Sequence, residues 1–290
     1  MKRLVFLIGI VLILGCLGQG GGILPKEEIP EVFEGSTTGE ISLDFTTHNG
    51  YIEIYVWDSE TYKIEVNKWA RASTSREARQ KVEALQVDFS ESETGGGMKL
   101  TLDVEYESNT GADVKAYLPR NPFGEVDITT TNGYIRAEEI TAQNASLETT
   151  NGFIEAFITA EDIRIDTTNG RIDGFYQGSN VRISTTNGAI SVECGDGGRY
   201  SLETTNGRIT VQVGSRGNFD VSTTNGAISI TVKGDFSFDL ETTNGTVTVD
   251  APEVSYTQED RTHKKGQTSE EYEVDIEAST TNSSITVEKQ

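Results

Sequence analysis

The chain has 290 residues, 24% of them charged and 8% aromatic, a composition that supports a sizeable core and excludes a disordered polyampholyte. Its 46 acidic residues against 24 basic ones give a formal net charge of -22. Because the acids are spread through the chain, a nucleic acid or an anionic lipid surface would be repelled, and we expect no nucleic-acid partner.

The segment 1–15 has the order of a signal peptide. Met1-Lys2-Arg3 supplies a basic start, and the apolar run from Leu4 to Leu14 follows it. This run is shorter than the ~20 apolar residues that span a bilayer. Its end, Ile13-Leu14-Gly15-Cys16, is similar to a lipoprotein signal, in which Cys16 becomes the lipidated first residue of the mature chain. The alternative is an ordinary cleaved signal with a chance cysteine at this position.

Residues 16–33 begin with a glycine-rich tract, and we expect them to form a flexible tether between the lipid and a folded body. The predicted location is therefore outside the cell, anchored to the cell membrane through the N-terminal lipid. The second cysteine, Cys194, occupies a position that is valine in later repeats (Val213 and Val232). It is predicted to be a small buried hydrophobe rather than a reactive thiol.

Residues 34–124 combine repeat-like strands with an insertion. Strand alternation on both sides of Asn49 predicts the first coils, but the next copy of this asparagine, Asn132, follows only after several repeat lengths. Within this interval, alternating apolar residues predict three strands, and Thr74 with Glu77 forms the capping box of a helix. We expect the helix to cover the open end of the repeat stack. A separate binding domain is the alternative.

Residues 125–290 are organised by the unit Thr-Thr-Asn-Gly, which occurs seven times. Successive units follow one another at a nearly constant step, and a short fixed period of this kind is typical of a repeat architecture. A last copy at Asn282 follows after twice that step, and Ser283 replaces its glycine, as is common in a terminal coil. The asparagines of the seven units are Asn132, Asn151, Asn169, Asn187, Asn206, Asn225 and Asn244.

Apolar residues recur four positions before and three positions after each of these asparagines, so each repeat reads as strand, Asn-Gly turn, strand, turn. The threonine two positions before each asparagine shares the parity of the apolar positions and is expected to face inward. Glycine is expected to supply a left-handed turn conformation. An all-β solenoid would stack like residues and let the asparagine amides form a hydrogen-bonded ladder. An antiparallel β-meander or barrel of hairpins is the alternative.

The repeated Thr-Asn-Gly-x-Ile units, the early Thr47-His48-Asn49-Gly50 and the segment ending Tyr117-Leu118-Pro119 resemble the DUF4097 family of adhesin-like β-helix proteins. The resemblance covers most of residues 35–290. It implies a right-handed β-solenoid, here with about 18–19 residues per coil by the repeat spacing, in a cell-envelope setting. It supplies no catalytic residues.

Two places are candidate ligand contacts. Tyr134, Phe153 and Arg171 lie two positions after successive asparagines, and side by side they would form a strip for sugar stacking or protein contact. Alternatively, the inserted segment 58–124 covers them. The stretch 252–272, which includes His263, breaks the repeat pattern. It is either a degenerate coil or a loop that leaves the stack, and loops of this length are often functional.

Known catalytic chemistry has little support in the sequence. Neither His48 nor His263 has a second ligand at zinc spacing, and nucleophile-elbow and phosphate-loop motifs are missing from the sequence. Outward acids recur in the repeats, but mixed with arginines they are more typical of a solvated face than of a catalytic pair. We therefore expect no enzyme activity, no metal and no cofactor. The recurring acids are Glu148, Asp166, Glu203, Asp220, Asp239 and Glu241.

These features predict a lipid-anchored, adhesin-like cell-surface protein with a structural or ligand-binding role, whose ligand is an envelope protein or a glycan and which performs no turnover. One alternative is a carbohydrate-active β-helix enzyme that uses outward carboxylates. Another is an envelope scaffold or sensor that binds a regulatory partner.

Overall fold

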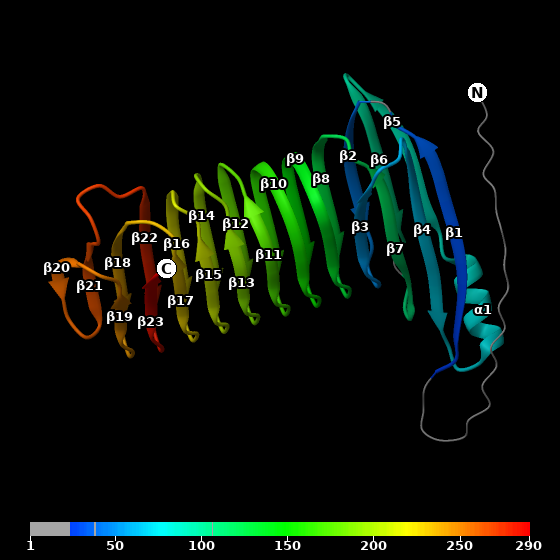
Figure 1. The fold of residues 1–290 in the computed structure, drawn as a ribbon. Coiled ribbons are helices and arrows are strands. Elements are labelled where there is room, and N and C mark those ends of the chain that lie inside the picture. Colours follow the sequence, from blue (N-terminus) through cyan, green and yellow to red (C-terminus); the bar gives the residue numbers. More distant parts are fainter. Residues whose placement is uncertain (1–23, 38, 106) are drawn as a thin grey trace.

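The computed structural model describes residues 24–37, 39–105 and 107–290, so the predicted signal peptide and Cys16 lie outside the described residues. This part of the chain is almost all strand and forms two rows of β-strands, joined into one open sheet (Figure 1). Each repeat contributes a strand to row A, a turn at Asn-Gly, and a strand to row B. We call this unit a coil.

Strands of neighbouring coils pair in parallel within each row. For example, Ile183 pairs with Leu202 in row A, and Ile190 pairs with Ile209 in row B. The antiparallel meander or barrel is therefore wrong for the repeats. Row A consists, in spatial order, of β2 (Glu40–Thr46), β8 (Phe123–Thr130), the second parts of β9 (Ile135–Thr149) and β10 (Ile154–Thr167), β12 (Asn180–Thr185), β14 (Arg199–Thr204), β16 (Gly217–Thr223), β22 (Val274–Thr280) and β18 (Phe236–Thr242).

Row B runs beside it in the same order. It consists of β3 (Ile52–Trp57), the first parts of β9 and β10, β11 (Ile172–Gln177), β13 (Ile190–Cys194), β15 (Ile209–Val213), β17 (Ile228–Val232), β23 (Ile285–Lys289) and β19 (Val247–Asp250).

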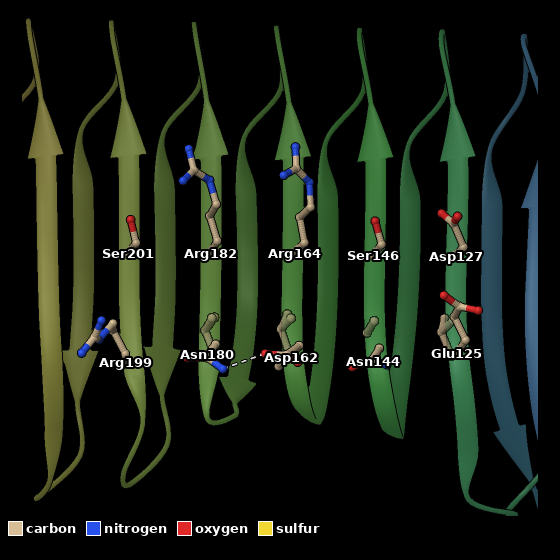
Figure 2. A pocket seen from close by; sticks show the side chains of 14 residues that line it. Glu125, Asp127, Asn144, Ser146, Asp162, Arg164, Asn180, Arg182, Arg199 and Ser201 are labelled. Carbon is tan, nitrogen blue, oxygen red and sulfur yellow. Dashed lines mark hydrogen bonds between the residues drawn. The ribbon is translucent and has the colours of Figure 1, made fainter.

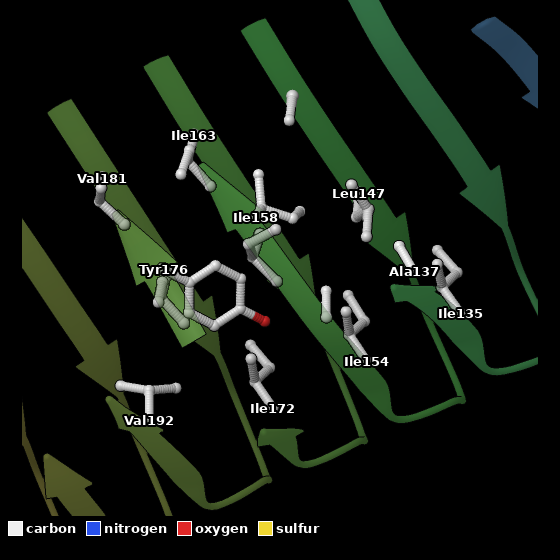
Figure 3. Packing of buried hydrophobic residues seen from close by; sticks show 14 of the residues in the cluster. Ile135, Ala137, Leu147, Ile154, Ile158, Ile163, Ile172, Tyr176, Val181 and Val192 are labelled. Atoms are coloured by element: carbon white, nitrogen blue, oxygen red, sulfur yellow. The ribbon is translucent and has the colours of Figure 1, made fainter. Parts of the chain in front are cut away.

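The apolar residues of both rows face one continuous core (Figure 3). Ile163 and Val181 are neighbours in row A, Ile154 and Ile172 are neighbours in row B, and all four are at most 3% exposed. The ring of Tyr176 lies among these residues in the same core. Because a flat strand cannot bury its apolar face alone, each coil depends on the coils beside it.

The Thr-Thr-Asn-Gly corner holds neighbouring coils together through two hydrogen bonds and a close approach of the backbone at glycine. The Nδ2 of Asn187 donates to Oδ1 of Asn169 at 2.8 Å, and the same bond recurs along the ladder. The hydroxyl of Thr185 is buried and donates to the carbonyl oxygen of Gly170 at 3.0 Å. A Cβ added to Gly188 would lie 1.6 Å from that same oxygen.

The expected left-handed conformation of these glycines is wrong, because none of the seven Thr-Thr-Asn-Gly glycines has a positive φ. Glycine is required instead by the close approach of one coil to the next.

The N-terminal end of the stack is extended by the inserted segment. β6 (Gly97–Val104) and β7 (Thr110–Pro119) add in parallel to β2 and β3. β5 (Val87–Thr94), β4 (Thr61–Arg71) and β1 (Lys26–Ser36) then add antiparallel strands at this edge. The helix α1 (Ser75–Ala84) is capped by Thr74 as predicted and packs against β1 and β4 through Ala78 and Val82.

Residues 26–33, expected in the tether, belong instead to β1. Ile29 and Phe33 point to the same side of this strand, and Phe33 packs against the core. On the edge strand, Pro30 and four glutamates limit further strand pairing. Because these glutamates interrupt the apolar residues, the alternation of apolar and polar residues that predicts a strand is weak in this segment.

The C-terminal coil is not at the end of the stack. β22 and β23 lie between the coil of β16 and β17 and the coil of β18 and β19. Accordingly, Asn282 donates to Asn225, and Asn244 donates to Asn282, both at 2.8 Å. The expectation that Ser283 marks a terminal coil is therefore wrong.

The stretch 252–272 is neither a degenerate coil nor an irregular loop. It contains the hairpin of β20 (Ser255–Glu259) and β21 (His263–Gln267), and β21 pairs antiparallel with β18. The hairpin covers the C-terminal edge of row A, which would otherwise offer unpaired backbone groups.

Candidate functional site

Three aromatic rings stack on the outer face of row B. Tyr51, Tyr134 and Phe153 lie on or next to β3, β9 and β10, two positions after the asparagine of their coils. The ring centroids of Tyr51 and Tyr134 are 4.8 Å apart, and those of Tyr134 and Phe153 are 4.7 Å apart, with nearly parallel planes. Arg171 continues this column, because its Cζ lies 4.8 Å from the Phe153 centroid.

The geometry of this column decides what it can bind. The rings cover one another's faces, Arg171 lies over the free face of Phe153, and Lys115 Nζ lies 5.7 Å from the centroid of Tyr51. Sugars stack on exposed ring faces, so the column does not offer the sugar platform expected from the sequence. It presents ring edges outward. The inserted segment reaches the column through Lys115, but Tyr134 and Phe153 remain half-exposed.

A buried carboxylate lies at the base of the ring column. Glu53 is 4% exposed, and its Oε1 accepts a hydrogen bond of 2.8 Å from the hydroxyl of Tyr134. Lys115 Nζ lies 3.1 Å from Oε2 without hydrogen-bond alignment, and Arg136 Nη1 lies 3.4 Å from Oε1. Burial alone would raise the pKa of Glu53, but the contacts of Tyr134 and Lys115 outweigh it and hold the pKa below its usual range.

A second set of aromatic side chains lies at the outward position four residues further along, on β3, β7, β10 and β11, whereas β9 carries Glu138 and Glu139 there. Tyr55 and Tyr117 stack at 5.4 Å on β3 and β7, and Phe157 and Phe175 pair in register on β10 and β11. Phe157 is 46% exposed, which is unusual for so large an apolar side chain. We call the two sets together the ring-bearing face. It consists of Tyr51, Tyr134, Phe153, Tyr55, Tyr117, Phe157 and Phe175.

The ring-bearing face ends abruptly along the stack. In the next coils, the position two after the asparagine is Ala189, Arg208 and then Ala227. The position of Phe157 and Phe175 becomes Glu193, Gln212 and Thr231. The fold therefore does not require aromatic residues at these positions, and their concentration at one end of row B is a local feature of this face.

The other candidate ligand contact is far from this face. His263 lies on β21 at the C-terminal end of the stack (Figure 1), where its Nε2 is 2.8 Å from Oδ1 of Asp239. Lys265 Nζ lies 2.7 Å from the other oxygen of the same carboxylate. These bonds, that of Lys265 first, lower the pKa of Asp239 even though burial opposes them. The structure thus brings Tyr134, Phe153 and Arg171 together, whereas His263 contacts Asp239 at the far edge of the stack.

The remaining reactive side chains are engaged or inaccessible. Cys194 is 2% exposed, and burial raises the pKa of its thiol, so it is a poor nucleophile. Among the acids of row A, Asp166 forms an ion pair with Arg164 and accepts a hydrogen bond from Ser184. Within the described ranges, no three His, Cys, Asp or Glu side chains are placed to hold a metal ion.

Comparison with known proteins places this chain in a family. The family model described as Toastrack DUF4097 matches residues 38–288, which is most of the chain. The chain belongs to the Toastrack DUF4097 family. No curated protein matches it.

Three solved structures are similar to this Toastrack chain at 10% sequence identity. A candidate cell adhesion protein from Clostridium sporogenes has a TM-score of 0.34 and is matched over 90% of this chain and 100% of its own. A candidate adhesin from Parabacteroides distasonis has a TM-score of 0.45, with 90% and 97% covered. A candidate adhesin from Parabacteroides merdae has a TM-score of 0.41, with 90% and 96% covered.

Sequence reasoning missed several residues of the ring-bearing face in this Toastrack chain. Tyr51 follows Asn49 by two positions and could have been found with the rule that found Tyr134. Glu53 and Lys115 gave no such signal, because their ion pair joins β3 to β7 of the inserted segment, which has no Thr-Thr-Asn-Gly unit. Among the residues that the structure describes, no helix is long and apolar enough to cross a bilayer.

Proposed function

We propose that this chain is an adhesin-like protein of the cell surface that binds a partner protein, without chemical turnover, through the ring-bearing face. The observation that carries the proposal is the gathering of seven aromatic side chains on five neighbouring strands, β7 and the four strands of row B from β3 to β11. At the same positions in later coils, the stack tolerates alanine, serine and threonine. Selection for the fold alone does not account for the aromatics.

The composition of this face is that of a protein contact. Tyrosine, tryptophan and arginine dominate the energetics of protein interfaces, and Trp57, Arg136 and Arg171 flank the rings. Phe157 supplies an exposed apolar side chain. The charged side chains between the two sets of rings form ion pairs with one another, as in Lys115 with Glu53 and Arg136 with Glu155. Because the chain carries a net charge of -22, a partner with a basic contact surface would be favoured electrostatically. The covered ring faces make a glycan the weaker candidate at this face.

The same geometry supports binding rather than catalysis. A catalytic carboxylate needs access to its substrate, whereas Glu53 is buried and held by Tyr134 and Lys115. Incubation with acidic and neutral polysaccharides tests this part. We expect no new reducing ends, and bond cleavage above the level of a heat-inactivated sample would contradict the absence of turnover.

The proposal also includes the length of the coils, the handedness of the solenoid and the attachment of the chain to the membrane. We infer coils of 18 or 19 residues, supported by ladder bonds between asparagines 18 and 19 positions apart. A right-handed path agrees with the general handedness of parallel crossovers. Anchoring through Cys16 would place the ring-bearing face outside the cell, and retention of membrane association by a Cys16→Ser variant would contradict it.

A double variant tests the ring-bearing face directly. Phe157→Gln and Phe175→Thr copy residues that the stack already carries at this position, Gln212 and Thr231. Binding of the purified protein to envelope fractions of its source cells should fall by about tenfold or more. The matched control exchanges Gln212→Thr and Thr231→Gln at the same position in later coils. Equal binding of the two double variants to the envelope fractions would contradict the proposal.

A further inference from the structure

The outer face of row A carries a groove that crosses five strands, from β8 to β14 (Figure 2). Its volume is about 380 Å³. The strand backbone at Ala145, Ile163 and Val181, whose side chains face the core, forms its floor. Outward side chains five and seven positions before each asparagine form its two rims, and we call it the row A groove.

The two ends of the row A groove have opposite charge. Glu125 and Asp127 lie at the end on β8, whereas Arg164, Arg182 and Arg199 lie on β10, β12 and β14. Elsewhere in row A, the position of Arg164 and Arg182 is mostly acidic. It is occupied there by Asp44, Asp127, Asp220, Glu277 and Asp239.

Arg164 and Arg182 form a pair of like charges. They are direct partners in the parallel ladder, and their guanidinium groups lie side by side and point the same way (Figure 2). Like charges at such positions destabilise a sheet. Nε of Arg164 lies 2.7 Å from Oδ2 of Asp166, and Nη2 of Arg182 lies 3.7 Å from Oε2 of Glu203.

These ion pairs leave most of the donors of the two arginines open. The side chain of Arg164 is 61% exposed and that of Arg182 is 58% exposed. For Arg199, no carboxylate of a described residue lies within 4.0 Å of the guanidinium. On a chain of net charge -22, three arginines on neighbouring strands are a local concentration of basic side chains, with Asp162 and Asp166 beside them on β10.

Adjacent, parallel guanidinium groups are suited to one planar or tetrahedral anionic group, which accepts hydrogen bonds from both. The remainder of the rims is polar, and it includes one acid, Asp162 on β10, whose Oδ1 accepts a hydrogen bond of 2.7 Å from Nδ2 of Asn180 (Figure 2). Asn144, Ser146 and Asn180 offer amide and hydroxyl groups along the groove, which can pair with the hydroxyl groups of a sugar.

We propose that the row A groove binds a saccharide that carries a single anionic group, a carboxylate or a sulfate, held by Arg164 and Arg182. The acids on both sides set an upper limit to the charge of the ligand. Asp127 on β8 and Asp220 on β16 are five strand spacings apart, about 24 Å, with the arginines between them. A densely sulfated polymer would extend over both acids and be repelled.

This site is separate from the ring-bearing face, because it lies on the other row. The saccharide site can therefore be tested independently of the partner protein proposed for the ring-bearing face. It also differs from a catalytic carboxylate pair, since the proposal assigns the anionic group of the ligand to two arginines rather than to carboxylates.

Titration calorimetry at low salt tests the proposal with three probes. They are a xylo-oligosaccharide that carries one glucuronic acid, its neutral parent, and heparin. We expect the singly charged saccharide to bind about tenfold or more tightly than the neutral parent and more tightly than heparin per site. Equal binding of the charged and neutral saccharides, no binding of the charged one at millimolar concentration, or preference for heparin would each overturn the proposal.

Matched variants separate a specific site from a general charge effect. Arg182→Ser reproduces the serine found at this position in the neighbouring coils, Ser146 and Ser201. Arg208→Ala removes the same charge from row B, at a position that is alanine in the coils beside it. We expect Arg182→Ser to weaken binding of the charged saccharide by about tenfold and Arg208→Ala to change it by less than about twofold. Equal losses in the two variants would contradict the site.

Discussion

The side-chain amide of Asn244 donates a 2.8 Å hydrogen bond to Asn282, although 38 residues separate them in the chain. Asn282 in turn donates to Asn225, so the last coil of the sequence lies second from the end of the stack. The N-terminal end repeats this arrangement, because β2 and β3 lie between β6 and β7 on one side and β8 and β9 on the other. At both ends, a coil is held between segments that are distant in sequence, which protects it from fraying.

Amide hydrogen exchange should therefore follow the spatial order of the coils. β23 pairs with strands on both sides, whereas among the described strands β19 pairs only with β23 and has one further backbone bond, from Val247 N to Arg261 O. We expect the amides of β23 to exchange about tenfold more slowly than those of β19, equivalent to ~1.4 kcal/mol of additional opening free energy. Faster exchange in β23 would indicate sequential stacking and contradict the interleaved coil.

Alanine at a corner glycine should be strongly destabilising. In Gly188→Ala, the new Cβ meets the carbonyl oxygen of Gly170 at 1.6 Å, and the two coils must separate. We expect a loss of about 3 kcal/mol in the free energy of unfolding, measured by urea denaturation. Gly95→Ala is the control, because nothing lies within 4 Å of its added Cβ. Similar losses for the two variants would show that the coils do not approach this closely.

The buried threonine of the corner should contribute more than its exposed neighbour. Thr185→Val keeps the shape of the side chain but leaves the carbonyl oxygen of Gly170 without its hydroxyl donor. The expected cost is about 1 to 2 kcal/mol in the free energy of unfolding. Thr186→Val changes the adjacent, exposed threonine and should cost less than about 0.5 kcal/mol. A larger loss for Thr186→Val would contradict the inward orientation of Thr185.

Glu53→Gln should lower the free energy of unfolding at neutral pH and make this free energy depend less on pH in the acid range. Because the folded pKa of Glu53 lies below the usual range, its ionised form stabilises the protein at and above the unfolded pKa, and this contribution is lost as pH falls through the folded pKa. We expect Glu53→Gln to cost about 2 kcal/mol at pH 7 and the difference from the parent to shrink below about pH 4.5.

Glu155→Gln is the control for that experiment, since Glu155 also contacts Arg136 but its side chain is 35% exposed. The cost should be less than about 1 kcal/mol. If the stability difference caused by Glu53→Gln were constant from pH 7 to pH 3, the charge of Glu53 would not be what stabilises this face.

The repeat spacing favoured the parallel coils and the asparagine ladder over an antiparallel meander, because a ladder of like residues forms only where equivalent strands are neighbours. It could not order the coils at the C-terminus. Ile276, Ala278 and Ile285 fit the apolar positions of any coil equally well, so the pattern does not say which neighbours the last coil takes.

The candidate site was predictable only in part. The position two after each asparagine identified Tyr134 and Phe153, but neither their mutual coverage nor the buried Glu53 can be read from spacing. Lys115 reaches Tyr51 from another coil through pairing of β7 with β3, which depends on how the insertion folds. The contact of His263 with Asp239 could not be predicted either, because it depends on the pairing of the hairpin strand β21 with the repeat strand β18.

Site-specific photo-crosslinking in the source cells tests the central claim most directly. A photoreactive phenylalanine analogue replaces Phe157 in one variant and Gln212, at the same position further along row B, in another. We predict a discrete crosslinked protein from position 157 that position 212 does not give, and its loss when Phe175→Thr is added. Identical crosslinking from both positions, or none from position 157 in intact cells, would contradict a binding role for the ring-bearing face.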